Sequence, residues 1–305
     1  MQRFRDKGKV SKPIETVVFR ISAMRMTGLK VLAVATRYWR PGEDYLNEIV
    51  KAVKGKIVDD DFVVVSEKAI SIALSNIVDE SEVKPGLGAR WIASFWMRTV
   101  WGYFLGPLCH LRQKLLLQLR DYPVKVGSRH KQVALHGAGL LQALMFGSEG
   151  GIDGSNLPYS YVSLPLNEAG AVAERIRLLI WAASRKRVLV MVVDTDKTYS
   201  FRNFHFTPRP NPVSGIHSFG GFAAYVVGRM FKLERRATPL AVAGCFMSAE
   251  VALRVAEVAN RARGFGAGRT VWDMAEMFKV SLSDVSWEML ETVRHKPIVI
   301  VRKRR

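Results

Sequence analysis

Cysteine is scarce in this chain, and the short motifs of the common zinc and nucleotide sites are missing. The two cysteines, Cys109 and Cys245, are far apart and form no CxxC spacing. This pattern argues against a disulfide framework or a zinc site and favours a reducing compartment, the cytoplasm. No GxxxxGK[ST] sequence occurs, so we expect no P-loop. The six histidines are too widely spaced for a local zinc pattern.

Acidic residues are also few, with 27 Asp and Glu against 46 Lys and Arg, which gives a formal net charge of +19. Such a charge attracts polyanions, including nucleotides and nucleic acids. The basic residues are scattered, however, and no zinc-finger, RRM or KH signature accompanies them. We therefore expect nucleic acid only as a secondary partner. Residues 1–13 and 302–305 are interpreted as solvated basic arms, without the apolar core of a signal peptide.

A membrane span is not predicted for the apolar stretch at residues 91–109. Arg98 lies near its middle, and Gly102, Gly106 and Pro107 interrupt its second half. A spanning helix needs about 20 predominantly apolar residues. We expect buried or dimer-interface helices here, and contact with a membrane is the weaker alternative.

Hydrophobic residues make up 49% of the chain, enough for a substantial core. Their periodicity alternates between strands and helices, which indicates a mixed α/β (α+β) fold. The expected strands are 16–21, 29–35, 61–66, 132–135, 188–193 and 297–301. The expected helices are 45–52, 168–184, 248–263 and 284–295, with a helix or turn at 68–77 and a glycine turn at 264–268.

Two acids occupy positions typical of ligand sites. Asp153 lies in the glycine-rich turn Gly150-Gly151-Ile152-Asp153-Gly154-Ser155-Asn156. Asp194 follows the apolar run at 188–193, and α/β sites commonly lie at the carboxyl end of such a strand. Either acid alone could instead be an Asx-turn or a cap.

Several segments resemble the coenzyme F420-0 γ-glutamyl ligase family. They are the glycine-rich turn, the later Leu164-Pro165-Leu166, the strand that ends in Val193-Asp194-Thr195, the strand at 61–66 with its following turn, and the final helix and strand. The resemblance runs from about residue 55 to the C-terminus. It implies one ligase-like domain at 14–301, with a longer helical segment at about 203–277.

The resemblance implies amide ligation driven by GTP. The substrate carboxylate becomes an acyl phosphate, and the amine of glutamate then displaces the phosphate. It also implies Mg²⁺ or Mn²⁺, a nucleotide and a small carboxylate as ligands, coenzyme F420-0 among the candidate acceptors, and an intertwined homodimer. Phosphoryl transfer depends mainly on positioning and charge neutralisation.

The family pattern assigns roles to particular residues of this chain. The metal candidates are Asp153, Asp194, Asp196 and Asp284, and the nucleotide candidates are Gly151, Ser155, Asn156 and Thr195. Two lysines are catalytic candidates because the chain departs from the family. Lys68 could replace a lysine that the family carries one turn later, and Lys197 or Arg202 could replace the arginine of its Asp-Thr-x-Gly-Arg pattern.

The altered motifs leave a second hypothesis open. The fold could persist without ligase chemistry and bind an anion or a nucleic acid through its positive charge. Such binding would depend steeply on salt and would not respond to changes at Asp153 or Asp194.

Overall fold

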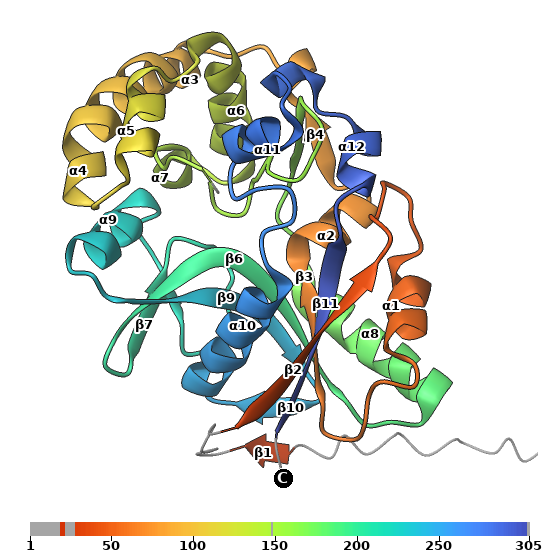
Figure 1. Ribbon diagram of the computed structural model, residues 1–305. Helices are drawn as coiled ribbons and strands as arrows, with labels where there is room; N and C mark the ends of the chain where they lie inside the picture. The colour runs from red at the N-terminus through yellow and green to blue at the C-terminus, as the bar shows by residue number, and fades with distance from the viewer. Residues whose placement is uncertain (1–18, 22–27, 148, 304–305) are drawn as a thin grey trace, which may run out of the picture.

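The computed structural model describes residues 19–21, 28–147 and 149–303, and its centre is a mixed sheet of seven strands (Figure 1). Strands β3 and β6 run parallel, whereas β11 pairs antiparallel with both β2 and β3. The order is β2 (Leu29–Thr36), β11 (His295–Lys303), β3 (Phe62–Ser66), β6 (Leu189–Phe201), β7 (Phe204–Thr207) and β8 (His217–Ser218), and β9 (Glu234–Ala243) pairs along β6. The predicted mixed α/β fold class is confirmed.

Helices cover both faces of this sheet. One face packs against α1 (Tyr45–Val53), α2 (Glu67–Ala73) and α8 (Ala169–Ser184), and the other packs against α10 (Ala249–Arg263). Successive side chains of β3 therefore enter different cores: Val63 and Val65 lie on the α8 side, and Phe62 and Val64 lie on the α10 side. Burial on both faces explains why this strand is an uninterrupted apolar run.

A second, helical core lies above the sheet in Figure 1 and is centred on Met97 and Trp101, both fully buried. Segment η2 is a π-helix of 14 residues, far longer than the single turns in which π-helices usually occur. None of the described helices is long and apolar enough to cross a membrane. The layer comprises α3 (Leu87–Trp91), η2 (Ile92–Leu105), α4 (Gly106–Leu108), α5 (Gln113–Arg120), α6 (Val124–Gly137), α7 (Leu140–Ala143) and α9 (Phe222–Met230).

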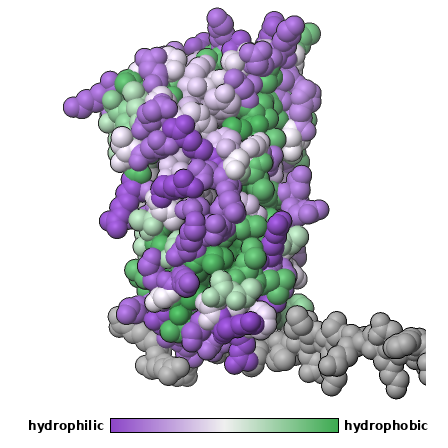
Figure 2. Space-filling model, turned by 90° about the vertical axis from the view of Figure 1, so that its right-hand side faces the viewer, coloured by the Kyte–Doolittle hydropathy of each residue, from purple (hydrophilic) through white to green (hydrophobic). Residues whose placement is uncertain are grey.

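Short elements complete the fold. Strands β4 (Ile77–Asp79) and β5 (Tyr161–Ser163) pair antiparallel, and β1 (Phe19–Ile21) pairs parallel with β10 (Cys245–Met247). The remaining elements are η1 (Glu80–Glu82), α11 (Val271–Phe278), η3 (Leu282–Asp284) and α12 (Trp287–Glu291). Figure 2 views the molecule from the right-hand side of Figure 1, where hydrophilic residues predominate between apolar patches.

Some sequence predictions were wrong in detail. Residues 132–135 form no strand but belong to α6, because Val133 and Ala134 pack into the helical core. Strand β6 does not end at Asp194 and continues to Phe201. The expected helix at 284–295 is limited to α12. The segment at 203–277 contains β7 to β10 as well as helices.

The predicted basic tail is also partly structured. Arg302 and Lys303 belong to β11, and Arg302 donates two hydrogen bonds of 2.7 Å to the buried carboxylate of Asp61. The predicted arm at 1–13 and residues 304–305 lie outside the described part of the chain.

Candidate active site

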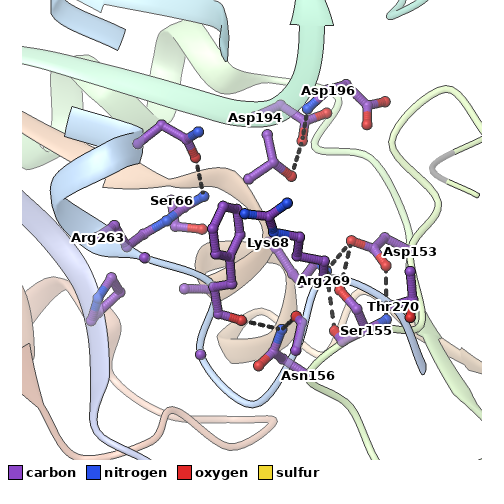
Figure 3. A pocket seen from close by; sticks show the side chains of 18 of the residues that line it. Ser66, Lys68, Asp153, Ser155, Asn156, Asp194, Asp196, Arg263, Arg269 and Thr270 are labelled. Atoms are coloured by element: carbon purple, nitrogen blue, oxygen red, sulfur yellow. Dashed lines mark hydrogen bonds and ion pairs between the residues drawn. The ribbon is translucent and has the colours of Figure 1, made fainter. Parts of the chain in front are cut away.

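A cavity of about 440 Å³ lies at the carboxyl end of β3 and beside the middle of the parallel strand β6 (Figure 3). Its walls include Ser66 at the end of β3, Lys68 on α2, Asp153 in the glycine-rich turn and Asp194 on β6. A further wall comes from the end of α10 and from residues after it, such as Arg263. The cavity therefore has the position at which open α/β sheets usually bind ligands.

A bulge in β6 presents its acids to this cavity. Asp194 pairs with Thr238 of β9, but the next paired residue, Lys197, lies opposite Ala237. Two extra residues, Thr195 and Asp196, are thereby accommodated in β6, and both line the cavity. Bulges beside functional sites commonly redirect side chains in this way.

Arg209 holds Asp194 in place from a proline-rich loop. Its Nε donates to Asp194 Oδ2 at 2.7 Å, and its Nη2 donates to Glu67 Oε1 at 2.5 Å. Arg209 and Glu67 are only 2% and 3% exposed. The guanidinium therefore neutralises two acids from different elements in a buried position, where an unpaired charge would be costly.

The same guanidinium fastens the glycine-rich turn. Arg209 Nη1 donates to the carbonyl oxygen of Gly150 at 2.8 Å. A Cβ added to Gly151, whose φ is +101°, would lie 2.6 Å from Arg209 Cζ. Gly151 thus leaves room for the guanidinium, and it is not among the residues that line the cavity.

Glu67 has an unusual environment for a carboxylate. Burial and the nearby charge of Asp194 outweigh the attraction of Arg209 and raise the pKa of Glu67 to about 7. Its Oε1 also accepts a 2.7 Å bond from the backbone N–H of Leu166. Glu67 therefore ties the start of α2 to both Arg209 and the loop before α8.

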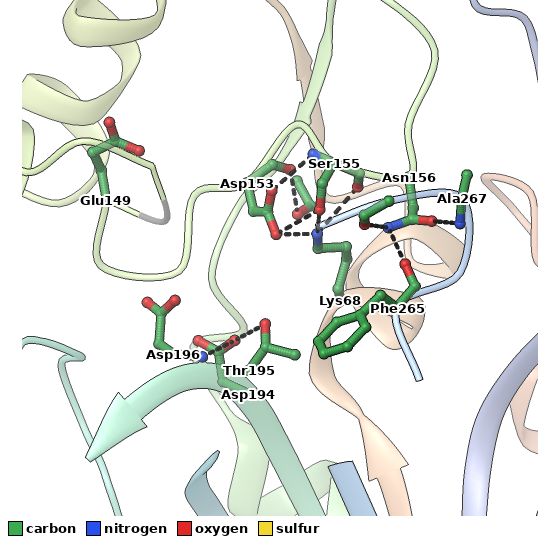
Figure 4. Close-up of polar contacts among 12 residues, drawn as sticks. Lys68, Glu149, Asp153, Ser155, Asn156, Asp194, Thr195, Asp196, Phe265 and Ala267 are labelled. Atoms are coloured by element: carbon green, nitrogen blue, oxygen red, sulfur yellow. Dashed lines mark hydrogen bonds and ion pairs between the residues drawn. The ribbon is translucent and has the colours of Figure 1, made fainter. Parts of the chain in front are cut away.

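Asp153 is paired with Lys68 on the opposite side of the cavity (Figure 4). The Lys68 ammonium donates to Asp153 Oδ2 and, at 2.7 Å, to the Ser155 hydroxyl. The backbone N–H of Ser155 donates to Asp153 Oδ1 at 2.7 Å, which is the geometry of an Asx-turn. Asp153 therefore shapes its own turn and also faces the cavity.

A buried charge network supports this turn from behind. Glu149 Oε1 accepts from the Lys131 ammonium and from the Gly147 N–H, and its Oε2 lies 2.9 Å from His130 Nε2. His130 Nδ1 lies 2.6 Å from Glu80 Oε1. Burial alone would lower the pKa of His130, but Glu80 and Glu149 outweigh it and raise this pKa to about 10.

His130 should make stability depend on pH. The pKa of His130 in the folded protein is about 10, above the ordinary value of 6.5. The protonated imidazole therefore stabilises the folded state fully below pH 6.5, and this stabilisation is lost as the pH rises through 10. We expect the difference in free energy of unfolding between wild type and His130→Gln to shrink across this range. Urea denaturation at several pH values measures it, and a difference that stays constant or grows with pH would contradict the charged network.

Asn156 has a structural role in this conformation. Its side-chain amide donates to the carbonyl oxygens of Phe265 and Gly268, and its oxygen accepts from the Ala267 N–H at 2.6 Å. The predicted glycine turn at 264–268 is thus held against the cavity as part of its wall.

The other predicted site residues divide into two groups. Lys197 lines the cavity and lies 3.2 Å from Glu257 on α10, and Thr195 lies beside Asp194. Asp284, in contrast, is exposed in η3, bonded to Ser281 and Ser283, and is not among the lining residues. Arg202 lies with its guanidinium 5.6 Å from the centre of the Phe201 ring, also away from the cavity wall.

Sequence reasoning missed the cations on the far wall. Arg263, Arg269, Arg294 and Lys296 all line the cavity. Arg263 donates to Asn260 at 3.0 Å, and the Arg269 guanidinium stacks 4.0 Å from the centre of the Phe265 ring. Their only sequence signal was the basic character of the C-terminal third, so their convergence could not be read from spacing.

The acids of the cavity do not by themselves form a complete metal site. Across residues 28–147 and 149–303, no group of three or more His, Cys, Asp or Glu side chains is arranged to hold an ion. Mg²⁺, however, is often bound by one or two carboxylates together with substrate phosphates. Asp153 and Asp194 both line the cavity, and a cation held there would need further ligands, such as substrate phosphates.

The chain is similar to one known family and to one archaeal protein. The profile of the F420-0:Gamma-glutamyl ligase family matches residues 33–249, which include Asp153, Asp194 and Arg209. An uncharacterised protein of Methanocaldococcus jannaschii is 33% identical over 288 residues, which cover 90% of this chain and 96% of that protein. The family supports a ligase activity at a general level. The chain belongs to the F420-0:γ-glutamyl ligase family.

Proposed function

We propose that this protein is a GTP- and divalent-metal-dependent ligase that joins an amino acid, glutamate in the first instance, to a small carboxylate such as coenzyme F420-0. The observation that carries the proposal is that Asp153 and Asp194, from two distant segments, line one cavity with Lys68 between their elements. Carboxylates that hold a divalent cation and a lysine beside the phosphates are typical of sites for nucleoside triphosphates.

The proposed reaction has two steps. An oxygen of the substrate carboxylate attacks the γ-phosphorus of GTP, GDP leaves, and an acyl phosphate forms. The amine of glutamate then attacks the acyl carbon, phosphate leaves, and an amide bond remains after the loss of the amine proton. Mg²⁺ or Mn²⁺ would be held by Asp153 and Asp194 and would neutralise phosphate charge.

Lys68 is proposed to bind a phosphate oxygen of the nucleotide. In the structure its ammonium neutralises Asp153, with side chains that are 21% and 18% exposed, so both groups remain accessible from the cavity. When a cation binds Asp153, the ammonium is free to turn toward a phosphate oxygen. Thr195 and Ser155 line the same region and could add hydroxyl contacts.

The cationic side chains on the far wall of the cavity would bind the anionic groups of the ligands. Arg263, Arg269 and Lys296 have no carboxylate within ion-pair distance among the described residues. A nucleotide and a carboxylate substrate supply the missing negative charge. A homodimer and a cytoplasmic location remain predictions.

Phosphate release tests this proposal. We expect release from GTP with Mn²⁺ to require both glutamate and the carboxylate acceptor, with F420-0 assayed first. Lys68→Met should lower the rate by at least about tenfold, because it removes a charge from the transferred phosphate. Lys54→Met is the matched control, since Lys54 is exposed at the end of α1.

The alternative function predicts a different outcome. If the chain only binds anions, no amide product forms with any nucleotide. Polyanion binding would then fall steeply with salt and would be the same in wild type and in Asp153→Asn.

A further inference from the structure

A stripe of exposed apolar side chains runs along the π-helix η2 and its neighbours. Its exposed members are Trp91, Phe95, Phe104 and Leu108, and the half-buried Val100 lies between them at the same spacing of four or five residues. Backbone hydrogen bonds that span five residues bring such positions onto one face. Trp91, Phe95, Phe104 and Leu108 are 51%, 46%, 66% and 44% exposed. We call this set the aromatic stripe.

The opposite face of η2 is firmly packed. Met97 and Trp101 are fully buried, and the indole N–H groups of Trp96 and Trp101 both donate to the carbonyl oxygen of Leu144. The helix is therefore anchored by its inner side. The exposure of the aromatic stripe therefore does not result from a poorly packed helix.

The chain segment that contains the stripe is basic, although Glu276 of α11 pairs with its Lys114 at 2.7 Å. Residues 84–136 contain nine Lys and Arg but a single acid, Asp121, which lies 3.3 Å from Arg98. Arg90 and Arg112 lie at the two ends of the stripe and are exposed, without an acidic partner among the described residues. The Arg120 guanidinium lies 4.4 Å from the centre of the exposed Tyr103 ring.

We propose that the aromatic stripe is a docking surface for an anionic lipid bilayer. Trp, Tyr and Phe favour the interface between headgroups and acyl chains, and Arg or Lys beside them are attracted to acidic headgroups. The protein would contact the bilayer surface through the exposed face of η2. The glycines, Pro107 and Arg98 of this segment favoured burial over membrane contact, but the structure leaves Trp91, Phe95 and Phe104 exposed.

Charge argues against a second copy as the occupant. A two-fold interface places the same patch against itself, so the unpaired cations of both copies would face each other. An acidic bilayer supplies the opposite charge across the whole face. Trp91, Phe95 and Phe104 do not line the cavity, so the stripe is separate from the candidate active site.

Vesicle co-sedimentation of the full chain tests the proposal, with phosphatidylcholine vesicles compared with vesicles that also contain phosphatidylglycerol. We expect binding only to the anionic vesicles, and weakening of that binding by salt. Phe95→Ser/Phe104→Ser and Arg90→Glu/Arg112→Glu should each weaken binding by about tenfold or more. The matched controls, Leu178→Ser/Leu179→Ser on α8 and Lys54→Glu/Arg187→Glu, should bind like wild type. Thermal unfolding verifies that every variant is folded.

Three results would overturn the proposal. The first is equal sedimentation with neutral and anionic vesicles. The second is vesicle binding by Phe95→Ser/Phe104→Ser that equals that of wild type, because binding would then depend on charge alone. The third is a dimer in light scattering that Phe95→Ser/Phe104→Ser dissociates, since the stripe would then be an interface between copies.

Discussion

Arg209→Met is expected to lower the free energy of unfolding by about 3–5 kcal/mol, because it leaves the buried carboxylate of Glu67 and the partly buried carboxylate of Asp194 without their cation. Arg209 contacts Glu67, Asp194 and the Gly150 carbonyl, and it is 2% exposed. Methionine approximates the length of the arginine side chain but supplies no charge or donor. Urea denaturation measures the loss, which should come with weaker nucleotide binding because Asp194 loses its anchor.

Two further variants sharpen this test. Arg209→Lys keeps the charge but lacks the planar guanidinium that reaches three acceptors. We therefore expect it to lower the free energy of unfolding, but by less than Arg209→Met. Arg40→Met removes the exposed ion pair with Glu291, so it should leave the free energy of unfolding nearly unchanged. Equal losses for Arg209→Met and Arg40→Met would contradict the central role of Arg209.

Asp194→Asn is expected to weaken GTP binding in the presence of Mn²⁺ by about 30-fold or more. It removes one of the two carboxylates proposed to hold the cation, and the loss of a buried charged partner costs about 2 kcal/mol or more. Calorimetric titration measures this affinity. Without Mn²⁺, the difference between wild type and Asp194→Asn should largely disappear.

Asp284→Asn is the control for this titration. Asp284 is an acid of the same type, exposed in η3 and away from the cavity wall, so its replacement should leave GTP affinity unchanged. If Asp194→Asn and wild type bind GTP equally with Mn²⁺, or if Asp284→Asn is the weaker binder, the proposed metal site is wrong.

Strands β2, β3, β11 and the first half of β6 were predictable from the sequence, whereas β7, β8 and β9 were not. β3 and the first half of β6 are buried on both faces, so each appears as a continuous β-branched run. The positions of Asp153 and Asp194 followed from turn chemistry and from the end of that apolar run. The continuation of β6 was not predicted, because the bulge at Thr195 and Asp196 interrupts the apolar pattern.

The cation beside Asp194 could not be predicted. Lys197 and Arg202 were favoured because they are near in sequence, but Arg209 occupies the position from a loop that folds back after β7. Residues 132–135 were misjudged because a four-residue apolar run fits a strand or one helical turn equally well. Both predictions were wrong because the structure depends on contacts between residues that are far apart in the sequence.

A crystal structure with GTP and Mn²⁺ tests the central claim most directly. Our account predicts Mn²⁺ between a phosphate oxygen and the carboxylates of Asp153 and Asp194, with the Lys68 ammonium moved from Asp153 to a phosphate. A nucleotide bound on the wall of Arg263, Arg269 and Lys296, with no Mn²⁺ within about 2.5 Å of either carboxylate, would contradict it.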